Sequence, residues 1–479
     1  MVQLSQEQAH LLLSAGVPPA AVTEFDSALQ VLRLPSRPTS ESLANDTQKA
    51  LAIYRAGEAL LAAWPRKPLR DITQGTGAAT VKTVLRAVRN AFARTYAERI
   101  YSKITNGYRS FVRAEELVYR AAELCPGLCP TKEAVEAELR LPLPDKEGTE
   151  IAQGDFLSHV LSSGKAGSHL LHTMLRPRNE SRELLDRFRR DGRLDLETTQ
   201  VERRGTAGYV FFNNPRYLNA EDDTTMDPLE TAVDLVLLDP EIEVGILRGT
   251  PMEHPKYRGR RIFSAGLNLT RLYEGKLPFM FFPTRDLGFV NKLYRGLTGD
   301  TWTPDLPEDT LEKPWMGVVE GFAIGGGCQL LLVMDYVIAE DGAYFNLPAR
   351  KEGIIPGAAP MRLGSFTGMR RAQEGILFGR TFPTDSPEGR ALVNEVVPYG
   401  EIDAAIERVV NGITGSGVVS FGANRKAIRI GQESPDLFRR YMALYCRDQA
   451  DCHFSPALTD NLQRLWASRN RPPPQDRKN

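Results

Sequence analysis

Residues 319–335 read VEGFAIGGGCQLLLVMD, and this stretch decides the fold. Three successive glycines, Gly325–Gly327, stand between a strand-like run and a long apolar run of helical character. Glycine permits unusual backbone dihedrals and close approach of a ligand, and a helix start offers N–H groups without intrahelical acceptors. The stretch therefore indicates a strand–turn–helix unit that binds an anion or stabilises an oxyanion. A plain tight turn explains the glycines equally well. The spacing matches neither the dinucleotide-binding motif nor the P-loop.

Two further segments accompany this stretch on either side. Residues 263–269 read FSAGLNL and follow the basic run KYRGRR at 256–261, whereas residues 344–357 read YFNLPARKEGIIPG. In this order the three segments resemble the enoyl-CoA hydratase/isomerase family, the crotonases, over about Gly205 to Val397. The resemblance implies an α/β fold with a crotonase (ClpP-like) spiral ββα core and a coenzyme A thioester as substrate. It also implies assembly into homotrimers or homohexamers.

The remaining sequence divides into regions of different periodicity. Residues 1–197 predict a helical N-terminal domain, with helices at Gln48–Ala63 and Ala78–Leu124 and an interruption at Gly75–Gly77. Residues 198–400 predict the crotonase core, with short strands at 206–212, 244–247, 315–319 and 336–339 that alternate with helices. Residues 401–479 predict a C-terminal helical region with a Pro-rich, charged and disordered tail at Arg471–Asn479.

Composition restricts the class of protein. The 479 residues include 60 basic and 60 acidic side chains, a balance atypical of nucleic-acid-binding proteins. No run of 18 apolar residues and no secretory signal is evident, so we expect neither a membrane partner nor export. The five cysteines, an odd number, predict reduced thiols and a cytoplasmic location.

We expect no metal site, because neither the histidine pair nor the cysteine pair has further ligands nearby in the sequence. His169 and His172 stand at a helical i, i+3 spacing without a third ligand, and we interpret them as surface or interface residues. Cys125 and Cys129 lack a second pair, and Cys328 has no histidine beside it, which predicts a packing role.

The family resemblance assigns backbone and binding roles to particular residues. It implies that the N–H groups of Leu267 and Gly326 hold the thioester carbonyl oxygen, on which negative charge develops when the α-proton leaves. It also implies that three segments line the coenzyme A pocket: His254, Pro255, Lys256 and Tyr257; Ala265, Gly266, Leu267, Asn268 and Leu269; and Ile355, Pro356 and Gly357. Basic side chains at 256, 258, 260 and 261 suit the coenzyme's phosphates, although a solvated basic loop is equally consistent.

Two departures from the hydratase pattern are informative. Hydratases of the family use two glutamates, and the corresponding positions here hold Gln329 and Ala349. An amide does not accept a proton near neutral pH, so the addition of water is disfavoured. Glu352 lies nearby, but three positions away from the expected place.

The segments LNAEDDTTMDPLETAVDLVLLDPEIEVGILRG, GGGCQLLLV and AYFNLPARKEGIIPGAAPMRL closely resemble a dioxygenase branch of the crotonases that also carries a helical N-terminal region. This branch needs no cofactor, neither metal nor flavin, and converts 3,5-dihydroxyphenylacetyl-CoA and molecular oxygen to 3,5-dihydroxyphenylglyoxylate and free CoA. Its product is used to build an amino acid, dihydroxyphenylglycine, of glycopeptide antibiotics. The resemblance implies that Glu221, Arg285 and Gln329 are active-site side chains. We expect Glu221 to recognise ring hydroxyls or transfer a proton, and Arg285 and Gln329 to orient substrate and peroxide.

Two other functions stay open at this point. One is a different crotonase reaction, such as hydrolysis or isomerisation of an aryl-acyl-CoA, and the other is a non-catalytic CoA-binding protein. The run Phe279–Phe282, within PFMFFP, predicts either a core or subunit contact or a lid over the aryl group.

Overall fold

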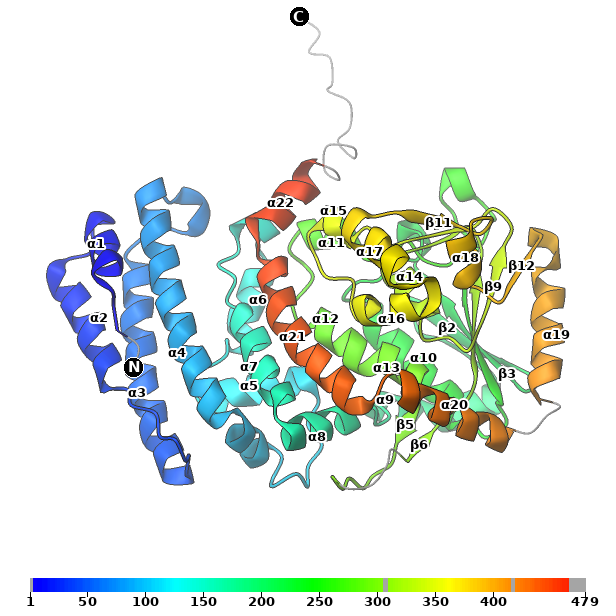
Figure 1. The fold of residues 1–479 in the computed structure, drawn as a ribbon, viewed down its shortest axis with the longest axis horizontal. Helices are drawn as coiled ribbons and strands as arrows, with labels where there is room; N and C mark the ends of the chain where they lie inside the picture. Colours follow the sequence, from blue (N-terminus) through cyan, green and yellow to red (C-terminus); the bar gives the residue numbers. More distant parts are fainter. Residues whose placement is uncertain (1–2, 305–308, 415–417, 465–479) are drawn as a thin grey trace, which may run out of the picture.

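The computed structural model describes residues 3–304, 309–414 and 418–464. The chain forms a helical region first, then an α/β core, and finally helices that return across the core to the helical region (Figure 1). The expected tail at Arg471–Asn479 lies outside the described residues. In the described part of the chain, no helix combines the length and the apolar character that crossing a membrane requires.

Capped amphipathic helices build the N-terminal region. Ser5, Thr39 and Asp71 each accept a hydrogen bond from the third residue of the helix that follows and so satisfy free N–H groups. The elements are α1 (Gln6–Ser14), α2 (Pro19–Val31), α3 (Ser40–Ala62), η1 (Lys67–Leu69), α4 (Ile72–Ile104), α5 (Ala114–Leu124), α6 (Lys132–Leu139), η2 (Leu143–Asp145), α7 (Ile151–Ser162), α8 (Gly164–Met174) and α9 (Asn179–Asp191).

The expected interruption at Gly75–Gly77 is wrong, because α4 runs through it without a break. A Cβ on Gly77 would lie 2.6 Å from Cβ of Ala15, so the glycine lets α4 approach α1 closely and does not end a helix. The break falls instead at Asn106–Tyr108, where three successive residues have positive φ. The expected helix at Ala78–Leu124 is therefore two helices, α4 and α5.

A twisted sheet forms the core, and its central strands are buried on both faces. Among the described residues the seven strands follow the order β1 (Arg193–Asp195), β2 (Thr199–Arg204), β3 (Ala207–Phe212), β4 (Val244–Gly249), β7 (Trp315–Val319), β9 (Tyr336–Glu340) and β12 (Glu395–Val397). The pairs from β3 to β12 are parallel, and β1–β2–β3 are antiparallel. The four predicted strands are thus confirmed, and the sheet begins before residue 198.

A smaller sheet lies beside the main one and carries the glycine turn. Its order is β11 (Thr381–Pro383), β10 (Tyr344–Asn346) and β8 (Phe322–Ile324), with β8 and β10 parallel. Strand β8 leads into Gly325, which begins helix α14 (Gly326–Leu331). The short pair β5 (Leu297–Thr298) and β6 (Thr310–Leu311) stands apart.

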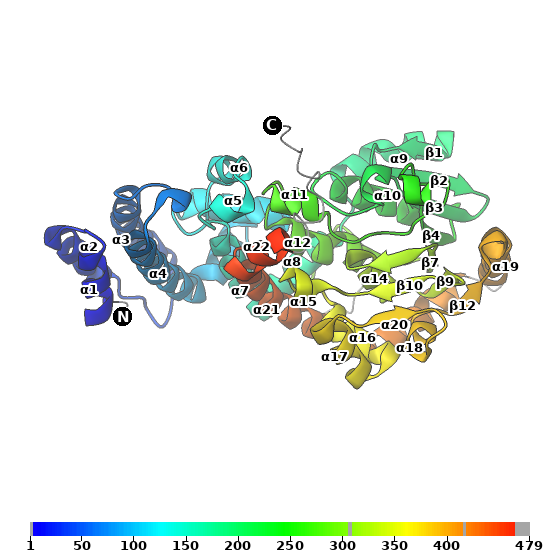
Figure 2. The ribbon, with the colours of Figure 1, turned by 90° about the horizontal axis from the view of Figure 1, so that it is seen from above.

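Helices cover the sheets on both sides (Figure 2). The core elements are η3 (Pro215–Tyr217), α10 (Met226–Leu238), η4 (Pro255–Tyr257), α11 (Leu269–Tyr273), α12 (Phe281–Thr284), η5 (Arg285–Val290), α13 (Asn291–Arg295), α15 (Ala349–Glu352), α16 (Ala359–Thr367), α17 (Met369–Phe378), α18 (Pro387–Ala391) and η6 (Tyr399–Glu401). The last helices are α19 (Ile402–Thr414), α20 (Val418–Gln432), α21 (Pro435–His453) and α22 (Pro456–Leu462).

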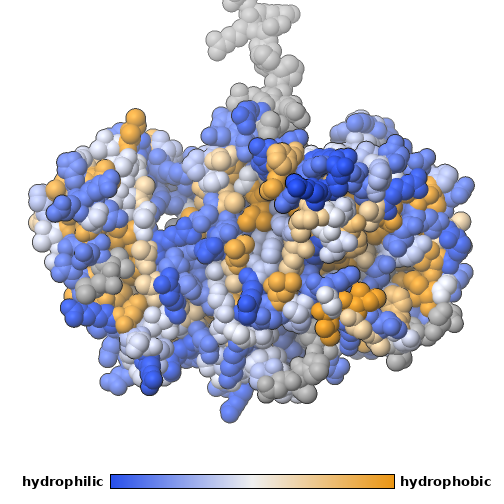
Figure 3. Space-filling model, in the orientation of Figure 1, coloured by the Kyte–Doolittle hydropathy of each residue, from blue (hydrophilic) through white to orange (hydrophobic). Residues whose placement is uncertain are grey.

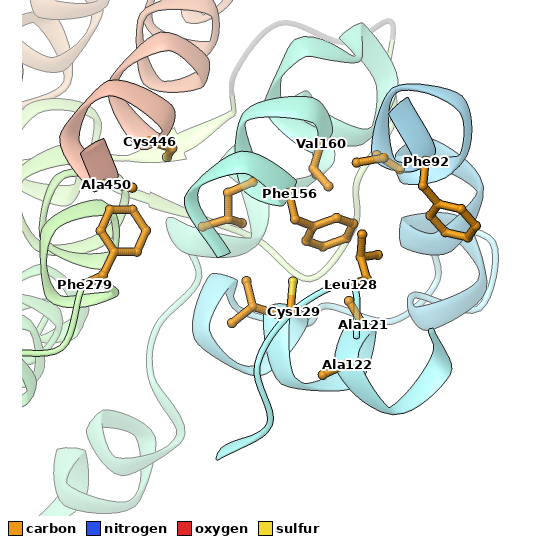
Figure 4. Packing of buried hydrophobic residues seen from close by; sticks show 14 of the residues in the cluster. Phe92, Ala121, Ala122, Leu128, Cys129, Phe156, Val160, Phe279, Cys446 and Ala450 are labelled. Carbon is orange, nitrogen blue, oxygen red and sulfur yellow. The ribbon is translucent and has the colours of Figure 1, made fainter. Parts of the chain in front are cut away.

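Helix α21, near the C-terminus, packs against the helical N-terminal region. It packs along α7, and both helices contribute to the hydrophobic core that fills the N-terminal region. Figure 4 shows Phe156 and Val160 of α7 inside this core, with Phe279, Cys446 and Ala450 at its edge. The core therefore includes side chains from three distant parts of the sequence, and it places α21 beside the loop that contains Phe279.

Candidate active site

Two loops and the glycine turn meet at one place in the core. The Glu221 N–H donates to the Gly266 carbonyl over 2.6 Å, and the Asn268 N–H donates to the Glu221 carbonyl over 2.8 Å. These two bonds form a parallel bridge between Glu221 and Leu267. The bridge fixes the loop at Leu267 without using the Leu267 N–H group.

Glycine is required where this loop touches the turn after β8. Gly266 has φ +82°, and a Cβ there would lie 2.5 Å from the Ile324 carbonyl oxygen. Gly325 has φ +53°, and its Cβ position would lie 3.9 Å from the Leu267 nitrogen. Within the described residues, the N–H groups of Leu267 and Gly326 donate to no protein acceptor. Two free backbone donors on neighbouring turns can together stabilise an oxyanion, as the family resemblance implies.

A buried ion pair lies directly beside these donors. Nε of Arg285 is 2.6 Å from Oε2 of Glu221, and Nη2 is 3.0 Å from Oε1, so the pair is bidentate. Both side chains are at least 96% buried. Burial alone would lower the pKa of Arg285, but the carboxylates of Glu221 and Asp286 raise it, and the guanidinium stays charged.

Arg285 also orients the remaining predicted side chain. Its Nη1 donates to Oε1 of Gln329 over 2.9 Å, and its Nη2 donates to the Gly326 carbonyl over 3.0 Å. The Gln329 amide nitrogen donates to no protein atom in the described part of the chain. Arg285 therefore holds the carboxylate, the amide and the oxyanion turn in one arrangement, and the amide N–H groups stay available to a ligand.

A cavity of about 30 Å³ lies at the centre of these groups. It is lined by all five residues predicted to be catalytic, namely Leu267, Gly326, Glu221, Arg285 and Gln329, and by the predicted binding residues Ile355, Pro356 and Gly357. Phe281 and Phe282 form part of its apolar wall, whereas Phe279 packs into the N-terminal hydrophobic core. The aromatic run thus supplies both a core contact and a wall of the cavity.

The cavity also contains Glu352, which lies three positions from the expected carboxylate, and two side chains that the sequence did not indicate, Asp286 and Tyr445. Burial raises the pKa of Asp286, and burial raises the pKa of Tyr445 well above its usual range. Tyr445 lies on α21, about 120 residues beyond the glycine turn. The i, i+4 spacing of Tyr441, Tyr445 and Gln449 would have placed them on one helical face, but not against this cavity.

The predicted coenzyme-binding loop at 254–257 does not line the cavity. His254, Pro255 and Lys256 are exposed, and Tyr257 is half-buried. The rings of Tyr257 and Phe322 contact edge to face, with their centroids 5.7 Å apart. Tyr257 belongs to a small apolar cluster that includes Ala265 and Ile324. This cluster offers an apolar surface that continues from the oxyanion hole toward the basic loop.

Only part of the basic run is available to phosphates. Arg260 forms an ion pair with Glu340, and Arg261 donates to the Gly249 carbonyl over 2.9 Å. Lys256 and Arg258 are exposed and form no ion pair among the described residues. Asn268 has a structural role, because its side chain donates to Asp222 over 2.8 Å and caps α11; Leu269 begins that helix.

Other candidate sites of the sequence have structural explanations. His169 is buried, and its Nδ1 lies 2.6 Å from the Tyr101 hydroxyl, so the expected surface position is wrong. Burial lowers the pKa of His169 to about 4. Cys328 is buried, and burial raises the pKa of its thiol to about 12, which suits a packing residue. No group of three or more metal-ligating side chains occurs among the described residues.

Comparison with known proteins adds the following. The family model described as enoyl-CoA hydratase/isomerase matches residues 202–429. The chain is 45% identical over 403 residues to the (3,5-dihydroxyphenyl)acetyl-CoA 1,2-dioxygenase of Amycolatopsis orientalis, which covers 84% of this chain and 91% of that protein. It is 28% identical to the short-chain-enoyl-CoA hydratase of Clostridium acetobutylicum, over 50% of this chain and 84% of that protein. Among solved structures, a carnitinyl-CoA hydratase from Mycobacterium avium gives a TM-score of 0.47 at 24% identity, covering 58% of this chain and 97% of that one. The similarity to the dioxygenase thus extends into the helical N-terminal region, whereas the similarity to the hydratases spans about half of the chain.

Proposed function

Because this chain belongs to the enoyl-CoA hydratase/isomerase family, the crotonases, we propose that it is a dioxygenase that converts 3,5-dihydroxyphenylacetyl-CoA and O2 to 3,5-dihydroxyphenylglyoxylate and free CoA. The observation that carries the proposal is the buried set of Glu221, Arg285 and Gln329 beside two free oxyanion donors. Gln329 of this set and Ala349 stand where a hydratase needs two carboxylates, and the relative with 45% identity is named for this dioxygenation.

The reaction begins at the α-carbon, which lies between the aryl ring and the thioester. Removal of an α-proton leaves a carbanion that is delocalised into the ring and into the thioester carbonyl. The N–H groups of Leu267 and Gly326 stabilise the negative charge on that oxygen, and donors of this kind contribute about 3–4 kcal/mol each. The enolate is thus the state that the backbone geometry favours.

Oxygen then reacts with the enolate without a further redox partner. The electron-rich carbanion transfers an electron to O2, and recombination forms a peroxide on the α-carbon. The peroxide attacks the thioester carbonyl, and the C–S bond breaks to release the CoA thiolate. Loss of the second α-proton with cleavage of the O–O bond gives the α-keto acid. Both oxygen atoms enter the product, so we propose that the enzyme needs neither metal nor flavin.

The polar side chains beside the two backbone donors recognise the substrate. We assign Glu221 to a ring hydroxyl and the free Gln329 amide group to the peroxide or a second hydroxyl. The cavity of about 30 Å³ is far smaller than ligand pockets of about 300 Å³ or more. We therefore expect the walls that contain Phe282 and Tyr445 to separate when the ring enters.

The surface supports assembly of several copies. Four large apolar side chains on α16 and α17 are exposed, Phe366, Met369, Leu377 and Phe378, and Figure 3 shows apolar residues among hydrophilic ones on the face of the molecule that it views. Large exposed apolar side chains can mark protein interfaces. We propose that these side chains are buried in a homotrimer or homohexamer in the cytoplasm.

Oxygen uptake by chelator-treated protein given 3,5-dihydroxyphenylacetyl-CoA tests the function, with free CoA followed in parallel. We expect one O2 consumed and one CoA released per substrate. Release of CoA without loss of O2 would instead mean hydrolysis of the thioester. Absence of both, with binding of the substrate retained, would favour a CoA-binding protein and contradict the dioxygenase.

A further inference from the structure

Glu352 is one of three carboxylates in the described cavity wall, with Glu221 and Asp286. It ends the short helix α15, which begins at Ala349. Residues three apart on a helix lie on the same face, and both Ala349 and Glu352 line the cavity. The carboxylate thus reaches the same space as the two oxyanion donors, although it is three positions away from the place where hydratases of the family carry theirs.

The other two carboxylates both lie near Arg285, and Glu221 is neutralised by it. Glu221 forms two charge-assisted hydrogen bonds with Arg285, and Asp286 lies 3.9 Å from the same guanidinium. The Glu221 carboxylate is therefore a weak base, because proton uptake would break the ion pair, whereas burial raises the pKa of Asp286. In contrast, Glu352 forms no hydrogen bond or ion pair with its side chain in the described part of the chain.

The electrostatic surroundings of Glu352 agree with this difference. Charged groups reach the cavity from the loop before α10 (Glu221) and from η5 (Arg285 and Asp286), while α14 and α21 present the uncharged Gln329 and Tyr445. None of them offsets the cost of burial at Glu352, and burial raises its pKa to about 7. A general base works best when its pKa lies near the working pH.

We propose that Glu352 is the general base that removes the α-proton of the aryl-acetyl-CoA substrate, an assignment that rests on the proposed function. The carboxylate takes the proton, and the C–H electron pair stays on the α-carbon as the enolate. After peroxide attack, the Glu352 carboxyl group returns this proton to the departing CoA thiolate. The freed carboxylate then accepts the second α-proton as the O–O bond breaks, and it releases that proton to water.

The test separates proton removal from oxygen chemistry. Under anaerobic conditions in D2O, the incorporation of deuterium at the α-carbon of 3,5-dihydroxyphenylacetyl-CoA reports the first step alone, by NMR or mass spectrometry. We expect Glu352→Gln to slow this exchange by at least about 10²-fold, a usual loss for a general base. Glu352→Asp should recover part of the rate, because it keeps a carboxylate. Arg350→Gln, on the exposed side of the same helix, should exchange like wild type.

A pH profile adds a second readout. In the wild type the exchange rate should rise with pH through a value near 7 and then level off, because only the ionised carboxylate accepts a proton. In Glu352→Gln this step should vanish, whereas substrate binding should stay within a few-fold of wild type. If Glu352 had only a structural role, Glu352→Gln would lower the exchange rate at every pH but keep the step near pH 7.

Each outcome decides the assignment. Exchange by Glu352→Gln at the wild-type rate, or equal loss in Arg350→Gln, would overturn it. If the wild type exchanged the α-proton but took up no O2 in air, the dioxygenase would be refuted. The ratio of the exchange rates of wild type and Glu352→Gln would still test whether Glu352 is the base. A wild-type protein that neither exchanges nor consumes O2 overturns both proposals.

Discussion

Gly326 contributes two backbone groups to the site, and the space that a side chain would take is occupied by Glu221. Its N–H faces the cavity, its carbonyl oxygen accepts a hydrogen bond from Arg285, and its Cα leaves room for the carboxylate of Glu221. A side chain here would compete with the ion pair for the same space. The glycine therefore couples the oxyanion hole to the polar side chains.

Gly326→Ala should abolish most of the activity while the protein stays folded. The added Cβ would lie 2.3 Å from Oε2 of Glu221, so the carboxylate must move and Arg285 with it. We expect oxygen uptake to fall by about 10²-fold or more, as when an oxyanion donor is lost. Gly422→Ala, whose Cβ meets no atom within 4 Å, is the control. Equal rates in the two variants would contradict the coupling.

Arg285→Met should destabilise the protein as well as inactivate it. It leaves the Glu221 carboxylate buried without a partner, which costs about 3–5 kcal/mol in the free energy of unfolding. The double variant Arg285→Met/Glu221→Gln should recover much of the stability and none of the activity. Urea unfolding measures the first effect, and oxygen uptake measures the second. If the double variant were no more stable than the single one, the ion pair would not be the cause.

At the scale of single residues, sequence motifs located the side chains but not their contacts. Glu221, Arg285 and Gln329 are up to 108 positions apart in sequence, and only the fold brings them within hydrogen-bonding distance. Glu352 was noticed but set aside, because alignment to a motif counts positions and a helical turn brings positions three apart together. Tyr445 had no signal, since it belongs to a helix without any motif.

At the scale of elements, helix α4 explains where turn signals mislead. Gly75 and Gly77 looked like a helix break, yet only Gly77 has a structural reason for its small size. The Asn106–Gly107 pair, an ordinary turn signal, did mark the true end of α4. The short β-strands were predicted well, because buried parallel strands form apolar runs with clear boundaries. Glycine in a helix is ambiguous, because either a turn or close packing can require it.

A pair of substitutions separates these two uses of glycine. Gly77→Ala should lower the free energy of unfolding by about 1–3 kcal/mol, because its Cβ would overlap Ala15 and the Trp64 ring. Gly75→Ala, two residues earlier in the same helix, meets nothing within 4 Å and should raise it by about 0.4–1 kcal/mol. Thermal or urea unfolding of both variants gives the comparison. Effects of the same sign would show that close packing is not the reason for Gly77.

At the scale of the whole molecule, the N-terminal helices and the core meet at Glu150. This side chain is fully buried, and it accepts a hydrogen bond from the Phe279 N–H over 2.7 Å. Burial raises the pKa of Glu150 to about 7. Lys146 and the Phe279 N–H act in the opposite direction but do not cancel the shift. The folded protein therefore keeps a proton there that the unfolded chain loses above about pH 4.5.

Stability should consequently fall as the pH rises from about 4.5 to 7, by at most about 3 kcal/mol from this group. The contribution is fully present below the unfolded pKa and is lost as the pH passes the folded one. Glu150→Gln should remove this slope, so the variant should gain stability relative to wild type over the same range. Urea unfolding between pH 5 and 8 measures the difference. Glu58→Gln, at an exposed position of α3, should keep the wild-type slope, and parallel curves for all three proteins would contradict the prediction.

The exposed apolar side chains on α16 and α17 lead to a prediction about assembly. Met369→Ser/Phe378→Ser replaces two side chains that are 63% and 69% exposed in the single chain. We expect the double variant to sediment as a smaller species than wild type in analytical ultracentrifugation. Ile72→Ser changes an even more exposed residue of the helical region and should leave the assembly unchanged. An unaltered mass for the double variant would place the interface elsewhere.

Helix α21 also has a consequence for how the chain is made. Its Tyr441 hydroxyl donates to the Gly357 carbonyl, Tyr445 closes the cavity, and Gln449 accepts from the Ile355 N–H, while its other side covers α7. During translation, both the cavity and the apolar surface of α7 therefore lack a wall until residue 449 has left the ribosome. The apolar surface of α7, synthesised some 300 residues earlier, therefore stays exposed during this time, and exposed apolar surface favours aggregation. A nascent chain of this protein should thus depend on chaperones until its last helix docks.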